Sequence, residues 1–387
     1  MQQPGLDDLP APSVSAEPIR VAIVADLLEE RWPSMDLVAD MVLAHLAGPG
    51  VMPTLVRPSM RRRPFLARYI NRYWDYPRWL RTVAPRFDVF HVVDHSYAHL
   101  VAEVDRARTV VTCHDADAFL PIVNPALNRS RLPRAIVRRV LRGLQAAAVV
   151  ACPSAATRDE MLGYGLLEPE RTIVVPNGVH PAFLAAPDPD AARWADEALG
   201  ASAPTLDLLH VGTCIPRKRI DRLLDVVAAV RRQVPGTRLI KAGGRLTPEQ
   251  LEQAARLGLT DCIVQMPFLG TPQLAALYRR ADVVITTSER EGFGLPVVEA
   301  LACGAPVVAT DLPVFREVGG DAVRFVPMDD TAAWCHEVLA AADAQRDPQA
   351  RSAAVAARSA RAALFSWPGH AEAMRSVYAR LAGRVTS

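Results

Sequence analysis

The stretch SEREGFGLPVVEA, residues 288–300, is the most informative part of this sequence. A short apolar run, residues 281–287, precedes it and predicts a buried parallel strand. A helix is expected over residues 296–303, because proline is favoured at the first helical position. The sequence therefore predicts a strand, a glycine-bearing turn and a helix N-terminus, one after another.

The predicted turn suits a ligand that contains phosphate. Gly292 and Gly294 let the main chain approach a ligand closely, and a helix start offers unpaired N–H groups and a favourable dipole. Glu291 and Glu299 flank the turn, and ionised carboxylates only accept hydrogen bonds, so they suit sugar hydroxyls rather than phosphate. The expected ligand is a diphosphate with sugars on either side, which is a nucleotide sugar.

The stretch EGFGLPVVE, residues 291–299, resembles the Glu-x7-Glu motif of the retaining glycosyltransferases of family GT4. The resemblance implies an α/β chain of GT-B fold, with two doubly wound Rossmann-like domains facing each other across a cleft. It also implies that Glu291 contacts the transferred sugar and Glu299 the nucleotide ribose. The donor-binding residues expected in the same motif are Gly292, Phe293, Gly294 and Leu295. The alternative is a helix with a charged cap and an incidental upstream glutamate.

Composition fits a soluble globular protein with two domains. The 387 residues are too many for one ordinary core, 50% of them are hydrophobic and 22% are charged. The net charge of +2 is near neutral, so nothing in the total requires nucleic acid. The six cysteines form no Cys-x-x-Cys pair, which argues against structural zinc and a disulfide framework.

Other enzyme classes lack their motifs. No Gly-x-Gly-x-x-Gly follows a predicted strand, so a nicotinamide enzyme is not supported. No Asp-x-Asp follows a strand and no His/Cys cluster occurs, so we expect no metal and no cofactor besides the nucleotide-sugar co-substrate. The start of the chain lacks a basic segment followed by an apolar one, and no apolar run nears the ~18 residues of a membrane span. A cytoplasmic protein is expected.

The chain is expected to consist of five parts. Residues 1–18, rich in proline and acidic groups, form a disordered lead, and residues 19–185 form an N-terminal acceptor-side Rossmann-like domain. Residues 186–203 form an interdomain linker, and residues 204–364 form the C-terminal nucleotide-sugar-binding Rossmann-like domain. By resemblance to GT-B chains, residues 365–387 form a helix that crosses back to the N-terminal domain.

Two further segments carry candidate site residues. VVTCHD, residues 110–115, places polar groups at the end of a predicted strand, where α/β folds bind ligands. It resembles a GT4 segment whose histidine contacts the donor sugar, which implies that role for His114, with Asp115 beside it. A structural polar histidine is the alternative.

GTCIPRK, residues 212–218, follows a strand predicted over residues 206–211. Gly212 permits a tight turn, and Arg217 with Lys218 is expected at a helix start. Cations are unfavourable there, so the pair suggests an anionic ligand. GT4 chains have a similar basic pair that binds the donor diphosphate, although Thr213 stands where some relatives carry arginine. The resemblance also implies donor contacts at Gly243, Gly244 and Phe268.

The N-terminal half departs from the family in its first loop. A strand is predicted over residues 19–25 and an amphipathic helix over residues 36–46. GT4 chains commonly carry a Gly-Gly pair in the loop between them, near donor phosphate and acceptor. Here residues 32–35 read Trp-Pro-Ser-Met, which leaves the role of this loop open.

A basic aromatic segment covers residues 60–81. Its arginines are Arg61, Arg62, Arg63, Arg68, Arg72, Arg78 and Arg81, and its aromatic residues are Phe65, Tyr69, Tyr73, Trp74, Tyr76 and Trp79. This composition suits anionic lipid head groups or stacking on a carbohydrate acceptor, and we assign acceptor or membrane contact to Arg61, Arg62, Arg63, Trp74 and Trp79. Nucleic acid, or a solvated basic helix, is the alternative. A second basic amphipathic helix is predicted over residues 129–142.

The predicted function is that of a retaining, metal-independent glycosyltransferase. It would move a sugar from a nucleotide-diphosphate sugar to a hydroxyl of a glycan or lipid-linked acceptor, and GT4 motifs of the Gly-Thr-x-x-Pro-Arg-Lys type favour GDP-mannose over UDP-sugars. The expected partners are these two substrates and an anionic membrane touched peripherally at its inner face, without nucleic acid. The alternatives are another GT-B enzyme such as an epimerase, or a catalytically weak sugar-nucleotide-binding protein at the membrane surface.

Overall fold

The computed structural model describes residues 17–30, 32–48, 50–59, 67–124, 131–200 and 206–384. The predicted disordered lead lies outside these ranges except for residues 17 and 18, and so do Arg61, Arg62 and Arg63. Contacts divide the chain into two units. The first comprises Met1–Val111, Arg139–Val149 and Ala371–Ser387, and the second comprises Thr112–Arg138 and Val150–His370.

The N-terminal sheet has six strands in the order β2-β1-β3-β4-β5-β6. Its strands are β1 (Ile19–Val24), β2 (Val51–Val56), β3 (Val89–Val92), β4 (Thr109–Thr112), β5 (Val149–Cys152) and β6 (Thr172–Val174). They are parallel, and most are short apolar runs buried on both faces, as such sheets require. The chain passes from β1 to β2 on one side and returns to β3 on the other, so the strand order reverses between β1 and β3.

The helices of the first unit include the predicted amphipathic helix and part of the basic aromatic segment. Helix α1 (Pro33–Leu46) begins earlier than the predicted residue 36, because Pro33 suits the first helical position. The basic aromatic segment forms α2 (Ala67–Ile70), a π-helical turn (Asn71–Asp75) and α3 (Tyr76–Val83). Near the C-terminus, the Tyr378 hydroxyl of α16 (Trp367–Leu381) lies 2.7 Å from His91 Nδ1.

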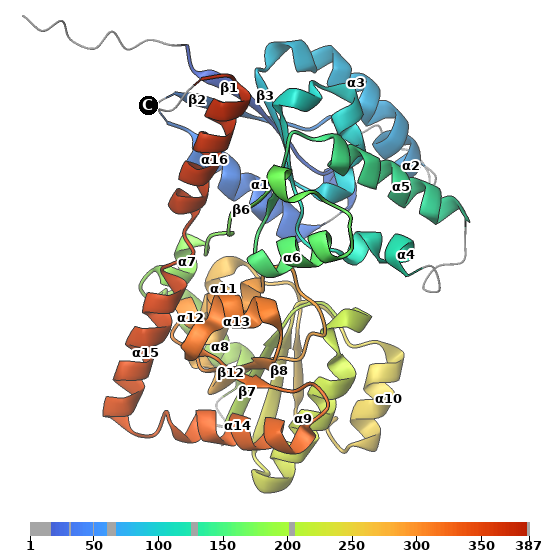
Figure 1. The fold of residues 1–387 in the computed structure, drawn as a ribbon. Helices are drawn as coiled ribbons and strands as arrows, with labels where there is room; N and C mark the ends of the chain where they lie inside the picture. The colour runs from blue at the N-terminus through green and yellow to red at the C-terminus, as the bar shows by residue number, and fades with distance from the viewer. Residues whose placement is uncertain are drawn as a thin grey trace, which may run out of the picture. The chain divides into compact units, whose positions relative to one another are not determined.

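The C-terminal sheet lies in the second unit and is also parallel, with the order β12-β11-β10-β7-β8-β9. Its strands are β7 (Leu206–Val211), β8 (Thr237–Ala242), β9 (Ile263–Met266), β10 (Val283–Thr286), β11 (Val307–Thr310) and β12 (Arg324–Val326). The strand order reverses between β10 and β7. The prediction of two doubly wound parallel sheets is confirmed (Figure 1).

Helices cover both faces of this second sheet (Figure 1). One face packs against α8 (Pro189–Leu199), α11 (Thr271–Arg280), α12 (Leu295–Ala302) and α13 (Pro313–Gly319). The other face packs against α9 (Ile220–Gln233), α10 (Pro248–Arg256) and α14 (Thr331–Asp343). Helix α8 falls within the predicted linker, and its buried Ala191, Ala195 and Leu199 join the first of these cores.

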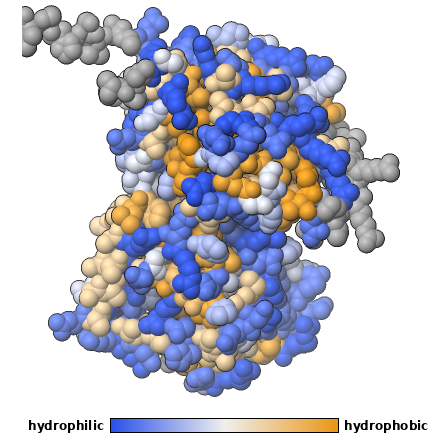
Figure 2. All heavy atoms as spheres, viewed as in Figure 1, coloured by the Kyte–Doolittle hydropathy of each residue, from blue (hydrophilic) through white to orange (hydrophobic). Residues whose placement is uncertain are grey.

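The remaining helices are α4 (Leu120–Val123), α5 (Arg131–Ala146), α6 (Ala155–Gly163), α7 (Pro181–Leu184) and α15 (Pro348–Ala362). Ser154 caps the N-terminus of α6, since its hydroxyl accepts the Thr157 N–H. Hydrophilic residues prevail on the visible face, with smaller hydrophobic areas between them (Figure 2). Within the ranges that the structure describes, no helix combines the length and apolarity of a membrane span.

Candidate active site

The two motifs singled out in the C-terminal half lie side by side. One loop follows β7 and the other follows β10, and these strands are neighbours at the point where the strand order reverses. The Glu289 N–H donates to the Arg217 carbonyl at 2.8 Å, and the Thr287 hydroxyl donates to the Lys218 carbonyl at 3.0 Å. Because α/β sheets bind ligands at such reversal points, this junction is the strongest site candidate.

Glu291 lies at the centre of this junction. Its carboxylate accepts hydrogen bonds from Arg217 Nη1 at 2.9 Å, from Ser288 Oγ at 2.7 Å and from Lys218 Nζ. Its side chain is only 8% exposed. Burial by itself would raise the pKa of Glu291, but the charges of Lys218 and Arg217 and these hydrogen bonds hold the pKa below its ordinary value. The structure thus brings Arg217, Lys218 and Glu291 together.

The basic pair lies before the helix rather than at its start. Residues Pro216–Lys218 form a 3-10 turn, Arg219 adopts a left-handed φ of 48°, and α9 begins at Ile220. Arg217 also donates to the Arg290 carbonyl at 3.0 Å, while Lys218 is buried. The local turn therefore fixes both cations next to the β10 loop, where they can bind an anion.

Two more basic side chains lie beneath the first loop. Lys241 is fully buried, and its ammonium donates to the Gly212 carbonyl at 2.5 Å. Burial lowers the pKa of Lys241. The pKa of His210 lies well below its ordinary value, because His210 is itself buried and the charges of Lys241 and Lys218 lie nearby. His210 is therefore neutral at physiological pH. Neither residue could be singled out from the sequence, beyond its place in a predicted strand.

The glycine turn after β8 approaches the first loop closely. Gly243 and Gly244 have left-handed φ values of 91° and 124°, which favour glycine. A Cβ on Gly243 would lie 3.0 Å from the Gly212 carbonyl oxygen, and one on Gly244 would lie 3.7 Å from the Cα of Thr213. The predicted donor residues Gly212, Thr213, Gly243 and Gly244 therefore gather in one place.

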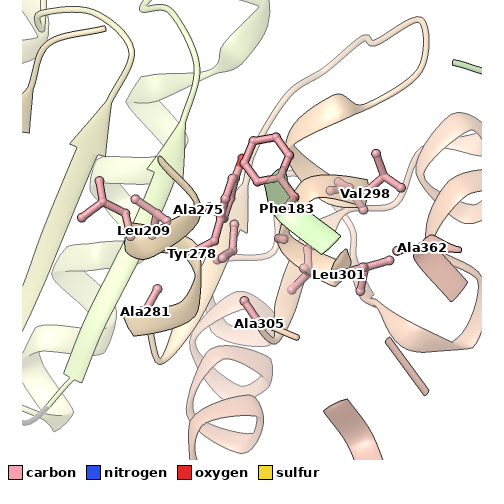
Figure 3. Close-up of a cluster of buried hydrophobic side chains, with 14 of the residues drawn as sticks. Phe183, Leu209, Ala275, Tyr278, Ala281, Val298, Leu301, Ala305 and Ala362 are labelled. Atoms are coloured by element: carbon pink, nitrogen blue, oxygen red, sulfur yellow. The ribbon is translucent and has the colours of Figure 1, made fainter. Parts of the chain in front are cut away.

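Glu299 lies on α12, which begins at Leu295, one residue before the predicted start. Its carboxylate accepts a hydrogen bond from the Tyr278 hydroxyl of α11 at 2.9 Å. Burial raises the pKa of Glu299 to about 7, against the opposing effects of the Tyr278 hydrogen bond and the Lys218 charge. Figure 3 shows Tyr278 beside Phe183, with the ring centroids 5.8 Å apart, so the core fixes the hydroxyl that holds Glu299.

His114 meets the glycine turn through its main chain. A Cβ on Gly292 would lie 1.6 Å from the His114 carbonyl oxygen, so only glycine fits there. The Gly292 carbonyl in turn accepts hydrogen bonds from Ser154 Oγ at 2.7 Å and Thr157 Oγ1 at 2.9 Å. The structure therefore places the predicted His114 and Gly292 next to each other.

Asp117 is a charged neighbour that the sequence did not single out. Its carboxylate lies 3.2 Å from Arg217 Nε and 3.1 Å from Arg290 Nε. Burial and the nearby acids Asp115 and Glu291 raise the pKa of Asp117, while the two arginines oppose that rise. The only available signal was a second aspartate shortly after His114.

Other predicted site residues have different surroundings. The Phe293 side chain packs in the core against Phe365, with centroids 5.5 Å apart, and the half-buried Leu295 packs on the same core. Phe268 is 63% exposed in the loop after β9. Trp74 is 59% exposed, and the Arg78 guanidinium lies 3.4 Å from the centroid of its ring. Trp79 is half-buried, and its ring centroid lies 6.0 Å from that of Tyr76.

Family models match both halves of the chain. Residues 26–183 match the model described as Glycosyltransferase Family 4, and residues 205–343 match the model described as Glycosyl transferases group 1. Among curated proteins, D-inositol 3-phosphate glycosyltransferase of Segniliparus rotundus is 31% identical over 74% of this chain and 66% of its own length. The protein of that name from Mycolicibacterium vanbaalenii is 32% identical over 78% of this chain and 69% of its own length. The one from Actinosynnema mirum is matched over 54% of its length, so the chain spans between 54% and 69% of the length of these three relatives.

Solved structures share the fold. Sucrose-phosphate synthase from Thermosynechococcus elongatus aligns with a TM-score of 0.72 at 19% identity, over 94% of this chain and 99% of that protein. Anabaena HepE, solved in complex with UDP, aligns with a TM-score of 0.70 at 18% identity, over 94% of this chain and all of that protein. At such identities the likeness concerns the fold alone.

Proposed function

Because the chain belongs to glycosyltransferase family 4 and has the GT-B fold, we propose that it transfers a sugar from a nucleotide-diphosphate sugar to an acceptor hydroxyl. The observation that carries this proposal is the convergence of Arg217, Lys218 and Glu291 beside a glycine turn at the strand-order reversal. Cations and free amides suit the diphosphate, and the acids suit the hydroxyls on either side of it.

In the proposed reaction, departure of the nucleoside diphosphate leaves negative charge on phosphate and positive charge on the sugar. Arg217, Lys218 and the N–H groups of residues 292–294 stabilise the negative charge. As the cations turn to the phosphates, Glu291 is released to accept hydrogen bonds from the transferred sugar. Glu299 accepts from the ribose, and His114 contacts the sugar. Removing one stabilising group of this kind typically costs ~3–4 kcal/mol of transition-state stabilisation.

The donor base and the acceptor are the finer parts of the proposal. The sequence motif favours GDP-mannose, whereas HepE was solved with UDP, so both nucleotides enter the test. The curated relatives are named for D-inositol 3-phosphate, so that polyol phosphate is tried as acceptor beside a lipid-linked glycan. We also propose that the surface of Arg68, Tyr69, Trp74 and Arg78, called the basic aromatic surface below, contacts the acceptor or an anionic membrane.

Calorimetric titration with UDP, GDP and ADP, followed by transfer assays with their sugar conjugates, tests the function. Lys218→Ala and Glu299→Ala are both expected to weaken nucleotide-diphosphate binding about tenfold or more. Arg256→Ala, on the exposed surface of α10, is the control. Unchanged affinity in both site variants would refute the site. Epimerised donor in the absence of acceptor would instead identify an epimerase.

A further inference from the structure

A second strand-order reversal lies in the N-terminal sheet, between β1 and β3. The register pairs Val24 with Val92, so the chain places Asp26 and Asp94 at equivalent positions just past the carboxyl ends of neighbouring strands. Val93 N–H donates to the Val24 carbonyl at 3.1 Å, which keeps the two strands paired up to this point. All of these residues belong to the first unit.

Asp26 is an unusual buried acid. It is only 3% exposed, and within the part of the chain that the structure describes the neighbouring Asp94 carboxyl is the only side chain close enough to share a hydrogen bond with it. Burial and the neighbouring Asp94 raise the pKa of Asp26 to about 10. A buried carboxyl group without its full set of hydrogen bonds costs roughly 1–3 kcal/mol, so Asp26 is a candidate for contact with a ligand.

The polar groups around Asp26 are already engaged elsewhere. Arg72 pairs with Glu30 at 2.8 Å and lies 4.1 Å above the Tyr97 ring. The Tyr97 hydroxyl accepts the Leu27 N–H at 3.1 Å, and the Tyr76 hydroxyl donates to the carbonyls of Ala25 and Val56. Arg72 also sits in the π-helical turn, a feature frequent at functional sites. The hydrogen bonds of these side chains thus go to groups other than Asp26, although the Arg72 charge opposes the rise in its pKa.

Asp94 completes a pair of acids with complementary chemistry. Its carboxylate accepts from Ser96 N–H at 2.8 Å and Ser96 Oγ at 2.6 Å, which fixes its orientation at the start of the following 3-10 helix. A neutral carboxyl both donates and accepts hydrogen bonds, whereas an ionised one only accepts. Two adjacent carboxyl groups of this kind match adjacent hydroxyls on one molecule. Within the described residues, no group of three His, Cys, Asp or Glu side chains could hold a metal here.

We propose that Asp26 and Asp94 form a subsite that binds hydroxyl groups of a polyhydroxylated acceptor, a cyclic polyol or sugar. This rests on the proposed function, because it assigns the acceptor of that reaction to the carboxyl ends of β1 and β3. Both acids are positioning residues for the acceptor, and neither takes part in the departure of the diphosphate.

Calorimetry on the full-length protein tests the subsite. The probes are myo-inositol, D-inositol 3-phosphate and inorganic phosphate, and the variants are Asp26→Ala and Asp26→Asn. The control is Asp105→Asn, which alters the exposed cap of the 3-10 turn Arg106–Arg108 that precedes β4. We expect Asp26→Ala to weaken binding of both inositol probes about tenfold or more, and Asp26→Asn to retain part of that affinity. The control should bind both as wild type does.

The melting temperature separates a binding role from a structural one. Asp26→Ala removes a buried carboxyl group that lies against the acid Asp94, so the melting temperature should stay the same or rise. Unchanged inositol affinity in this variant would overturn the proposal, as would a wild-type protein that binds phosphate but neither inositol probe. A lowered melting temperature without loss of inositol affinity would likewise assign Asp26 to structure.

Nucleotide titration keeps this inference distinct from the proposed function. Asp26→Ala should bind UDP and GDP as wild type does. A protein that binds inositol through Asp26 but transfers no sugar would support the subsite and refute the transfer. A protein that transfers sugar to the inositol phosphate with the same acceptor KM in Asp26→Ala and wild type would overturn the subsite alone.

Discussion

Two buried glutamates in the same site have opposite pKa shifts. Glu291 is surrounded by Arg217, Lys218 and Ser288, which outweigh the effect of burial and keep the pKa of its carboxyl low. Glu299 has a neutral phenol as its hydrogen-bond partner, so burial prevails and raises its pKa to about 7. At neutral pH Glu291 is therefore an acceptor only, whereas a large fraction of Glu299 is protonated and can also donate.

Replacing Glu299 by glutamine should change how stability depends on pH. Since the folded pKa lies above the unfolded one, the unfolded state ionises first, and this group lowers stability as pH rises from about 4.5 to about 7. The full loss above that window is roughly 3 kcal/mol. Urea unfolding of wild type and Glu299→Gln between pH 4 and 8 should show a flatter profile in the variant. Parallel profiles would contradict this assignment.

Lys218 should contribute to stability as well as to binding. Lys218→Ala leaves the buried Glu291 carboxylate with Arg217 as its remaining cation, and breaking a buried ion pair typically costs about 3 kcal/mol. Adding Glu291→Gln removes the uncompensated charge, so the double variant should recover much of the lost free energy of unfolding. Urea denaturation measures both. A double variant less stable than Lys218→Ala would contradict the pairing.

At the scale of the element, the turn between β10 and α12 is defined by its main chain. The Gly292 carbonyl accepts hydrogen bonds from the Ser154 and Thr157 hydroxyls at the start of α6. The main-chain N–H groups of Ala155 and Ala156, between these two residues, donate to the Glu317 carboxylate at 2.7 and 2.9 Å. The Gly292 carbonyl and the start of α6 are thus held by hydrogen bonds to each other and to Glu317. Its shape depends on groups far apart in the sequence.

Gly292→Ala is expected to be severely disruptive. The added methyl carbon would overlap the His114 carbonyl oxygen, and relief requires movement of the main chain, at about 3 kcal/mol. Melting temperature and sugar transfer should both fall. Gly163→Ala at the end of α6 is the matched control, because its Cβ would meet no atom within 4 Å. Equal melting temperatures for the two variants would contradict the predicted crowding.

For the molecule as a whole, the sequence allowed both sheets to be predicted from short apolar runs, because strands buried on both faces leave that pattern. The loops at Gly212 and Gly292 were also located, since glycines and charges mark strand ends. The hydrogen bonds of Glu291 with Arg217 and Lys218 could not be predicted from the sequence, because they depend on β7 and β10 being neighbours in the sheet. The Asp26 and Asp94 pair depends in the same way on the order of β1 and β3.

The basic aromatic surface gives a prediction for the whole protein. Arg68 and Arg78 are exposed, as are Tyr69 and Trp74, and each basic residue near an anionic membrane contributes about 1 kcal/mol. The variant Arg68→Ser/Arg78→Ser should therefore bind phosphatidylserine vesicles about thirtyfold more weakly than wild type in a co-sedimentation titration. Arg232→Ser/Arg256→Ser, which removes the same charge from α9 and α10, is the control. Equal loss in both variants would indicate general charge attraction instead.

The ion pairs of Glu291 have a consequence for selectivity. The Glu291 carboxylate occupies the two cations that a donor diphosphate needs. If inorganic pyrophosphate bound to these cations, the buried carboxylate would be left without a partner, which is unfavourable. A sugar nucleotide offers compensation, because its hydroxyls can solvate the displaced carboxylate. The empty enzyme would thus reject the inorganic fragment of its own donor, before any pocket for a particular sugar comes into play.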